Sequence, residues 1–157
     1  MRFLVLFGAL VLATSPLAAP GGSSFPPSTP PSTDAALEAD YAQAEYLIKS
    51  EKCEEAIPFL ERVATKDAKH ADALNYLGYC HRKAGRTAKA AEYYDKALTA
   101  DPNHRGALAY LGELYLMLKD LPKAEAQRAK LKSLCPDSCA QLEDLEDAIT
   151  TYKANTP

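Results

Sequence analysis

The sequence predicts an all-α fold built from repeated pairs of helices. Between residues 35 and 153 the chain holds one valine and three isoleucines, whereas alanine, leucine, glutamate and lysine dominate. Strands favour β-branched residues and helices favour the other four, so this composition indicates helices. Apolar residues in the same region recur at spacings of three and four, which is the period of one helix face. A sequence repeat of 34 residues is the third observation.

The first nineteen residues have the layout of a secretory signal peptide. Arg2 supplies a positive start, and the apolar run 3–13 is followed by small residues and Pro16. A permanent membrane anchor needs about 20 apolar residues, so this run is too short to be one. We therefore expect residues 1–19 to be removed during export, with cleavage between residues 19 and 22. No stable membrane span is expected to remain.

The next segment, residues 20–34, is expected to be a disordered linker. It contains five prolines and four serines. Such a composition cannot bury enough apolar surface to form a core. A proline-rich ligand for a partner domain is the alternative interpretation. The helical domain is expected to follow at residues 35–153.

Residues 71–104 align with residues 105–138. A leucine–glycine pair, an alanine and a proline recur at matching positions, namely Leu77-Gly78 with Leu111-Gly112, Ala90 with Ala124, and Pro102 with Pro136. Small residues let two helices approach closely where they cross, and each proline ends the second helix of its unit. Thr87 and Asp120 stand where these second helices begin, so we expect them to be N-caps.

This pattern resembles the tetratricopeptide repeat family, whose unit is a helix–turn–helix of 34 residues. The second repeat carries the family signature at Leu74, Leu77, Gly78, Gly85, Ala90, Tyr94, Ala97 and Pro102. His81 replaces the usual aromatic residue of that repeat, and Arg128 replaces a large aromatic in the next. The resemblance implies an α-solenoid of three units at residues 37–70, 71–104 and 105–138.

A last helix, expected at residues 139–153, closes the stack. Leu142, Leu145 and Ile149 continue the apolar register of the repeats. Ser138 with Gln141 matches a capping box at the start of this helix. Acidic residues cover the rest of it, as a terminal helix with an unstacked outer face requires for solubility.

The four cysteines are expected to form two disulfides, because an even count behind an export signal favours bridges over free thiols. Cys53 opens the second helix of repeat one, and Cys80 lies late in the next helix, which should run antiparallel to it. The pairs Cys53–Cys80 and Cys135–Cys139 are therefore preferred over the other two connectivities. The alternative is a thiol-based metal-binding or redox protein that uses Cys135 and Cys139, although no second ligand pair completes a zinc site.

Net charge and missing motifs exclude other functions. The formal net charge of −3 argues against a nucleic-acid partner, which usually meets a basic excess. No phosphate-binding glycine loop, GxSxG elbow or HExxH motif is present, so we expect neither an enzyme nor a cofactor. The remaining function is the one implied by the family resemblance, a concave groove that binds a protein or peptide partner.

By position in the repeat, the groove would be lined by Tyr41, Glu45, Asn75, Tyr76, Tyr79, Arg82, Lys83, Tyr110 and Glu113. Tyrosine suits peptide capture because it offers a large contact area with a polar tip. The chaperone-tail version of the family grips a terminal carboxylate with lysine and asparagine. Those positions hold Tyr41, Glu45, Tyr76, Gly106 and Tyr110 here, so that clamp is missing. The sequence thus predicts a non-catalytic adaptor, exported to a periplasmic or extracellular compartment.

Overall fold

Seven α-helices and no strand make up residues 33–156, which are the residues described in this computed structural model. The helices are α1 (Thr33–Lys49), α2 (Cys53–Lys66), α3 (Ala71–Lys83), α4 (Thr87–Ala100), α5 (Arg105–Met117), α6 (Leu121–Leu134) and α7 (Ala140–Asn155). They confirm the predicted all-α solenoid of helical repeats. None of these seven helices is both long and apolar enough to cross a membrane.

The predicted signal peptide and most of the predicted linker lie outside the described residues. Helix α1 begins at Thr33, so the last two residues of the expected linker, Thr33 and Asp34, are helical and that boundary was placed too late. Asp34 lies in the first turn of α1, where an acidic side chain interacts favourably with the helix dipole. At the other end, α7 runs to Asn155, two residues beyond the expected end of the capping helix.

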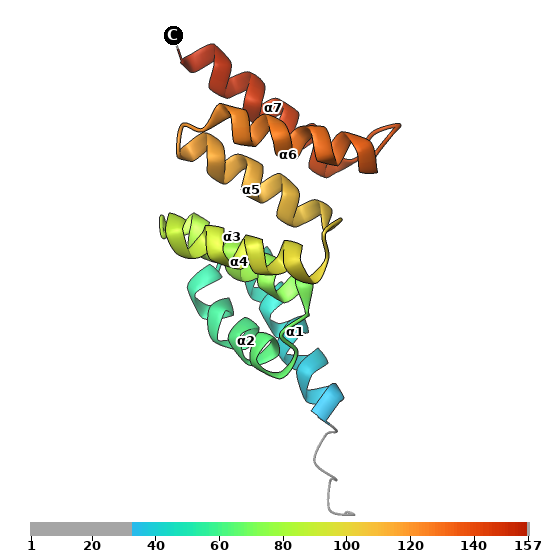
Figure 1. Ribbon diagram of the computed structural model, residues 1–157. Coiled ribbons are helices and arrows are strands. Elements are labelled where there is room, and N and C mark those ends of the chain that lie inside the picture. Colours follow the sequence, from blue (N-terminus) through green and yellow to red (C-terminus); the bar gives the residue numbers. More distant parts are fainter. Residues whose placement is uncertain (1–32, 157) are drawn as a thin grey trace, which may run out of the picture. The chain divides into compact units, whose positions relative to one another are not determined.

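The helices pack as consecutive antiparallel pairs, α1 with α2, α3 with α4 and α5 with α6, and α7 packs on α5 and α6 (Figure 1). Helix α5 contacts both α3 and α7, and the ring of Tyr41 on α1 lies 6.2 Å from that of Tyr76 on α3. The first helices of successive pairs are therefore neighbours, and their side chains share one surface. This surface is where the family resemblance places the groove.

Close helix crossings occur at the small residues identified in the repeat. A Cβ atom added to Gly78 would lie 2.5 Å from Cε1 of Tyr94, and one added to Gly112 would lie 2.7 Å from Cδ1 of Leu145. Ala90 is fully buried at the same crossing as Tyr94. At these two points a side chain larger than hydrogen fits only if the Tyr94 ring or the Leu145 methyl groups move.

Helices α4 and α6 end where the prolines predict. Each stops two residues before its proline, Pro102 or Pro136, because a proline disfavours helical geometry in the residue before it. Asp120 is the N-cap of α6, and its carboxylate accepts a hydrogen bond from the N–H of Lys123 at 3.2 Å. This predicted cap is confirmed.

Two other predicted caps are wrong. Thr87 is the first residue of α4, and the N-cap position belongs to Arg86, whose side chain makes no capping hydrogen bond. Ser138 does not cap α7 either, because Cys139 occupies the N-cap. The Ser138 hydroxyl instead donates to the Glu143 carboxylate at 2.5 Å. Helix α4 therefore starts one residue earlier than the side-chain pattern suggested, and α7 starts one residue later.

Histidines cap two helices that open repeats. Nδ1 of His70 accepts a hydrogen bond from the N–H of Ala73 at 3.2 Å, and Nδ1 of His104 accepts one from Ala107 at 3.0 Å. Each imidazole thus satisfies a backbone donor that the helix itself cannot. Because Nδ1 accepts, the His104 proton is on Nε2, which donates to Asp72 at 2.9 Å.

Both expected cysteine pairs lie within disulfide distance, and none of the four cysteines is free. The Cα atoms are 5.0 Å apart for Cys53–Cys80 and 5.8 Å apart for Cys135–Cys139. The first bridge joins α2 to α3 and the second spans the turn between α6 and α7. By loop-closure entropy alone these bridges stabilise the fold by ~3 and ~2 kcal/mol.

His81 is a buried, neutral histidine. Its side chain is 3 % exposed, and its ring stacks on Tyr93 with centroids 5.3 Å apart. Nδ1 accepts a hydrogen bond from Nε of Arg86 at 2.7 Å, while Nε2 is buried without a partner. Burial lowers the pKa of this imidazole below its ordinary 6.5, and the charges of Arg86 and Lys89 lower it further.

We predict that Gly78→Ala destabilises the protein by about 1–3 kcal/mol through overpacking against Tyr94, even though alanine is the better helix former. The measurement is the free energy of unfolding in urea. The same change in a Tyr94→Leu background should cost clearly less, because the ring that it would strike is gone. An equal cost in both backgrounds would show that helix crossing is not the reason for this glycine.

We predict that His81 makes the protein less stable as the pH falls below about 6.5. In that range the unfolded chain binds a proton on this imidazole and the folded chain does not, so protonation favours unfolding. His81→Phe keeps a ring against Tyr93 and removes the titrating group. The difference in unfolding free energy between pH 7.5 and 5.5 should therefore be smaller for the variant, and an unchanged difference would contradict the prediction.

Candidate functional site

Four tyrosines form two ring pairs across the first helices. The rings of Tyr41 on α1 and Tyr76 on α3 have centroids 6.2 Å apart, and those of Tyr79 on α3 and Tyr110 on α5 have centroids 5.2 Å apart. All four are half-buried. Burial is the main cause of the raised pKa of Tyr41, Tyr76 and Tyr110, so these hydroxyls stay protonated and can donate hydrogen bonds.

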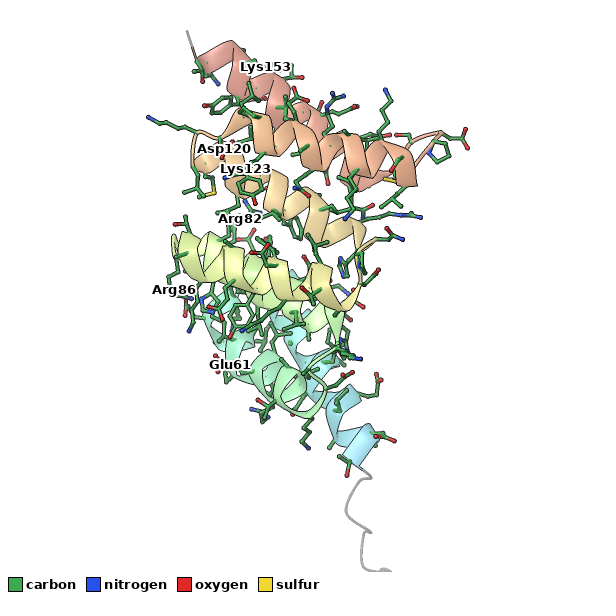
Figure 2. All side chains as sticks on the ribbon, viewed as in Figure 1. Glu61, Arg82, Arg86, Asp120, Lys123 and Lys153 are labelled. Carbon is green, nitrogen blue, oxygen red and sulfur yellow. A yellow bond between two sulfur atoms is a disulfide. The ribbon has the colours of Figure 1, made fainter. Side chains whose placement is uncertain are left out.

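Arg82 joins the second ring pair to an acidic partner. Its guanidinium makes an ion pair with Glu113 at 2.9 Å and lies 5.7 and 5.4 Å from the ring centroids of Tyr79 and Tyr110. Its Nε also donates to the Tyr94 hydroxyl at 3.4 Å. Arg82 is labelled in Figure 2. Its side chain is only 12 % exposed. Burial raises the pKa of Glu113 and the Arg82 charge opposes that rise.

The remaining predicted groove residues lie on either side of these rings. Glu45 accepts a hydrogen bond of 3.5 Å from the Tyr76 hydroxyl, which connects α1 to α3. Asn75 is buried, with 5 % of its surface exposed, and its Oδ1 has no hydrogen-bond partner. Lys83 is exposed at the end of α3.

The nine predicted residues do not share one cavity. An open cavity of about 490 Å³ includes Asn75, Tyr76 and Tyr110 in its wall, where α3, α5 and α7 meet. A second cavity of about 580 Å³ lies beside the Cys53–Cys80 bridge and takes in Tyr79 and Lys83. The ion-paired Arg82 and Glu113 line neither of them.

Sequence reasoning missed several residues that line the first cavity, which are Asp101, Asn103, His104, Arg105, Gln141 and Asp144. The 34-residue repeat register could have identified one of these residues. Asp144 holds the same place in the last helix as Tyr110 and Tyr76 hold in theirs, one and two repeats earlier respectively. The loop residues had no such signal, because the repeat pattern describes helix faces and not turns.

Metal binding finds no support in the described part of the chain. Among residues 33–156, no three His, Cys, Asp or Glu side chains gather closely enough to hold a metal ion. Cys135 and Cys139 lie within bonding distance of each other. While that bridge is intact, neither sulfur is a thiolate that could bind a metal.

We predict that Glu113→Ala destabilises the protein by about 1–3 kcal/mol, because it leaves the buried Arg82 charge without its acceptor. Glu113→Gln keeps an acceptor oxygen and should cost less. Glu92→Ala removes the exposed ion pair with Lys96 at 2.6 Å, and it should leave stability almost unchanged. Thermal unfolding of the three variants measures this order, and equal effects of the two alanine variants would contradict it.

Comparison with known proteins agrees with the fold. The most similar structures include a type III secretion translocator chaperone, SycD of Yersinia enterocolitica, at 20% identity over 80% of this chain and 98% of that chain (TM-score 0.67). PcrH in complex with the chaperone binding region of PopD matches at 22% identity over 78% of this chain and 92% of that chain (TM-score 0.67).

The first repeat domain of Spaghetti (RPAP3), bound to the HSP90 peptide SRMEEVD, matches at 16% identity over 76% of this chain and 97% of that chain (TM-score 0.67). A comparison of the sequence with curated proteins gives no match. Two models of the tetratricopeptide repeat match residues 41–105 and 81–138. Together they span more than half of the chain, which therefore belongs to the tetratricopeptide repeat family.

Proposed function

We propose that this protein is an exported, non-catalytic adaptor that binds a peptide or an extended segment of a partner protein on the surface of α1, α3 and α5. The row of half-buried tyrosines around Arg82 is the observation that carries this proposal. These rings present apolar faces and protonated hydroxyls without having to become ordered on binding. Aromatic and arginine side chains in such a setting are the usual anchors of protein interfaces.

The structural neighbours support the general class of function. PcrH binds a region of PopD, and the Spaghetti domain binds a short peptide. At 22% identity or less these proteins share the fold with this chain, and their partners are not transferred to it. This chain lacks the carboxylate clamp, because Tyr41 and Glu45 stand at two of its positions. We therefore infer that it recognises its partner through other contacts.

The proposed export rests on the cysteines and on the N-terminal sequence. Two cysteine pairs within disulfide distance favour an oxidising compartment. The signal-like residues 1–19 are outside the described residues, so their contribution is from sequence alone. We place the protein in a periplasmic or extracellular compartment. A thiol-based metal or redox function of Cys135 and Cys139 has less support, because those two sulfurs bridge each other.

We predict that Tyr76→Ala with Tyr79→Ala abolishes partner binding while helicity is retained. The partner is found by placing a photo-crosslinking phenylalanine at Tyr110 in cells that export the protein, and the crosslinked segment is identified by mass spectrometry. The double variant should lose that crosslink because two aromatic anchors are gone.

The matched control is Tyr93→Ala with Tyr115→Ala, which removes two half-buried tyrosines that do not belong to the predicted groove. It should keep the crosslink from Tyr110. Circular dichroism confirms that both double variants remain helical. Unchanged capture by the Tyr76 and Tyr79 variant would move the site to the convex face.

We predict that the exported protein starts between residues 20 and 23 and has no reactive thiol. Intact-mass spectrometry after alkylation with iodoacetamide tests both statements. The mass should match a chain that has lost its first segment, and alkylation should occur only after reduction. An intact Met1 would contradict export by this signal, and free thiols that bind metal stoichiometrically would restore the competing thiol-based function.

A further inference from the structure

The cavity between α3, α5 and α7 has an acidic, partly aromatic wall. Tyr76 and Tyr110 contribute their rings, and the carboxylates of Asp72, Asp101 and Asp144 are also in the wall. Arg105 is the one lysine or arginine among the lining residues of this cavity. His104 lies there as well, and its two ring nitrogens are already engaged by Ala107 and Asp72.

Asn75 provides an unpartnered hydrogen-bonding group in this wall. Its side chain is 95% removed from solvent, since 5 % is exposed, and its Oδ1 has no partner. Gly106 faces it, and a Cβ added there would lie 3.1 Å from Nδ2 of Asn75. Oδ1 itself is shielded from solvent, so a ligand donor reaches it only when the amide turns about its last side-chain torsion, which is broad and roughly two-fold. A buried amide without a partner is costly, so a ligand that supplies the missing hydrogen bond would be favoured.

The carboxylates of the wall differ in how far they are engaged. Asp72 accepts from His104 at 2.9 Å, and Asp101 accepts from the N–H of Asn103 at 2.9 Å. Asp144 makes no ion pair among residues 33–156 and is exposed. The Asp144 charge contributes to the raised pKa of both Tyr110 and Glu113, so its field reaches the ring pair.

The groove cation whose guanidinium lies 5.4 Å from the Tyr110 ring centroid is already neutralised. Arg82 is paired with Glu113 at 2.9 Å. Arg105 and the N-terminus of α5 would favour an anion, but three carboxylates outnumber that single guanidinium. The net field in the cavity is therefore negative, which favours a cation.

We propose that this cavity binds a lysine or arginine side chain from a basic segment of the partner protein. The charged head faces Asp144 and the amide of Asn75, and the apolar stem lies along the rings of Tyr76 and Tyr110. Such a side chain supplies N–H donors, a positive charge and a methylene stem, which are the three properties that the wall complements. This inference rests on the proposed groove function and adds the chemistry of its ligand.

The first test selects peptides without assuming a partner sequence. A library of nine-residue peptides with every position randomised is panned against the immobilised full chain with its disulfides intact. Recovered sequences should be enriched in lysine and arginine relative to the unselected library. Enrichment in aspartate and glutamate, or no charge preference, overturns the inference.

The second test uses one recovered peptide labelled with fluorescein, and measures its dissociation constant by fluorescence anisotropy. Asp144→Asn should weaken binding about two- to fivefold, as expected for an exposed ion pair, and should reduce the salt dependence. Asp95→Asn makes the same change in net charge on the exposed face of α4, outside the cavity wall. It should leave the affinity unchanged, and equal losses in the two variants would reduce the effect to net charge and overturn the inference.

Asn75→Ala should weaken binding about tenfold, because it removes the buried hydrogen-bonding group. Replacing the key lysine of the peptide by glutamine should abolish the difference between wild type and Asp144→Asn. If the glutamine peptide binds as tightly as the lysine peptide while Tyr76→Ala with Tyr79→Ala still prevents binding, the groove function stands and the cationic ligand is wrong. If no sequence is enriched, or the tyrosine double variant binds normally, the groove function itself fails.

Discussion

The arrangement of the helices depends on how closely α3 approaches α4 at Gly78, where the ring of Tyr94 takes the space that a side chain would need. That ring is fully buried, and its hydroxyl accepts a hydrogen bond from Arg82 at 3.4 Å. Tyr94, which belongs to the helix crossing, therefore also positions Arg82, which lies beside the tyrosines of the proposed groove. The core of repeat two and the proposed binding surface are parts of one packed unit, so the proposed groove would have its shape before a partner binds.

The groove chemistry follows from the same packing. Arg82 donates a hydrogen bond to Tyr94 and forms an ion pair with Glu113. Its charge is therefore neutralised within the protein and does not dominate the surface. The carboxylates beyond it, in the wall formed with α7, then set the field that an approaching segment meets. The capping helix thus has two physical roles. Leu145 closes the core over Gly112, while Asp144, its neighbour in the chain, faces the groove.

Much of the fold could be predicted because the repeat places residues at fixed positions on helices. The glycine crossings, the prolines that end helices and the cysteine pairing all follow from local spacing and from the antiparallel order of neighbouring helices. Helix starts were harder, since the backbone of the turn decides them. Thr87 has the composition of a cap, but the left-handed turn at Gly85 brings Arg86 to that position. The caps at His70 and His104 were missed because imidazole is an uncommon capping group.

The candidate site was predicted as a set of residues but not as a set of contacts. Arg82 and Glu113 were both placed in the groove, yet their pairing depends on side-chain conformations across two helices that sequence spacing does not determine. The same reason explains why the nine residues divide between two cavities. Residues from turns, such as Asn103, enter the wall only when the helices are in place, and no periodic signal marks them.

The positions of the two bridges have a mechanical consequence. One links α2 to α3 and the other links the end of α6 to the start of α7, so the first and last joints of the stack are tied covalently. The joint between the second and third repeats has no such tie. Across it α3 and α4 meet α5 through an apolar cluster, the Tyr79–Tyr110 ring pair, and the ion pairs of Asp72 with His104 and Arg82 with Glu113. Under load, the stack would bend or open first at this middle joint. A segment bound across α3 and α5 would connect the two sides of this joint. The stiffness of the whole array of helices would then depend on whether the groove is occupied by its partner.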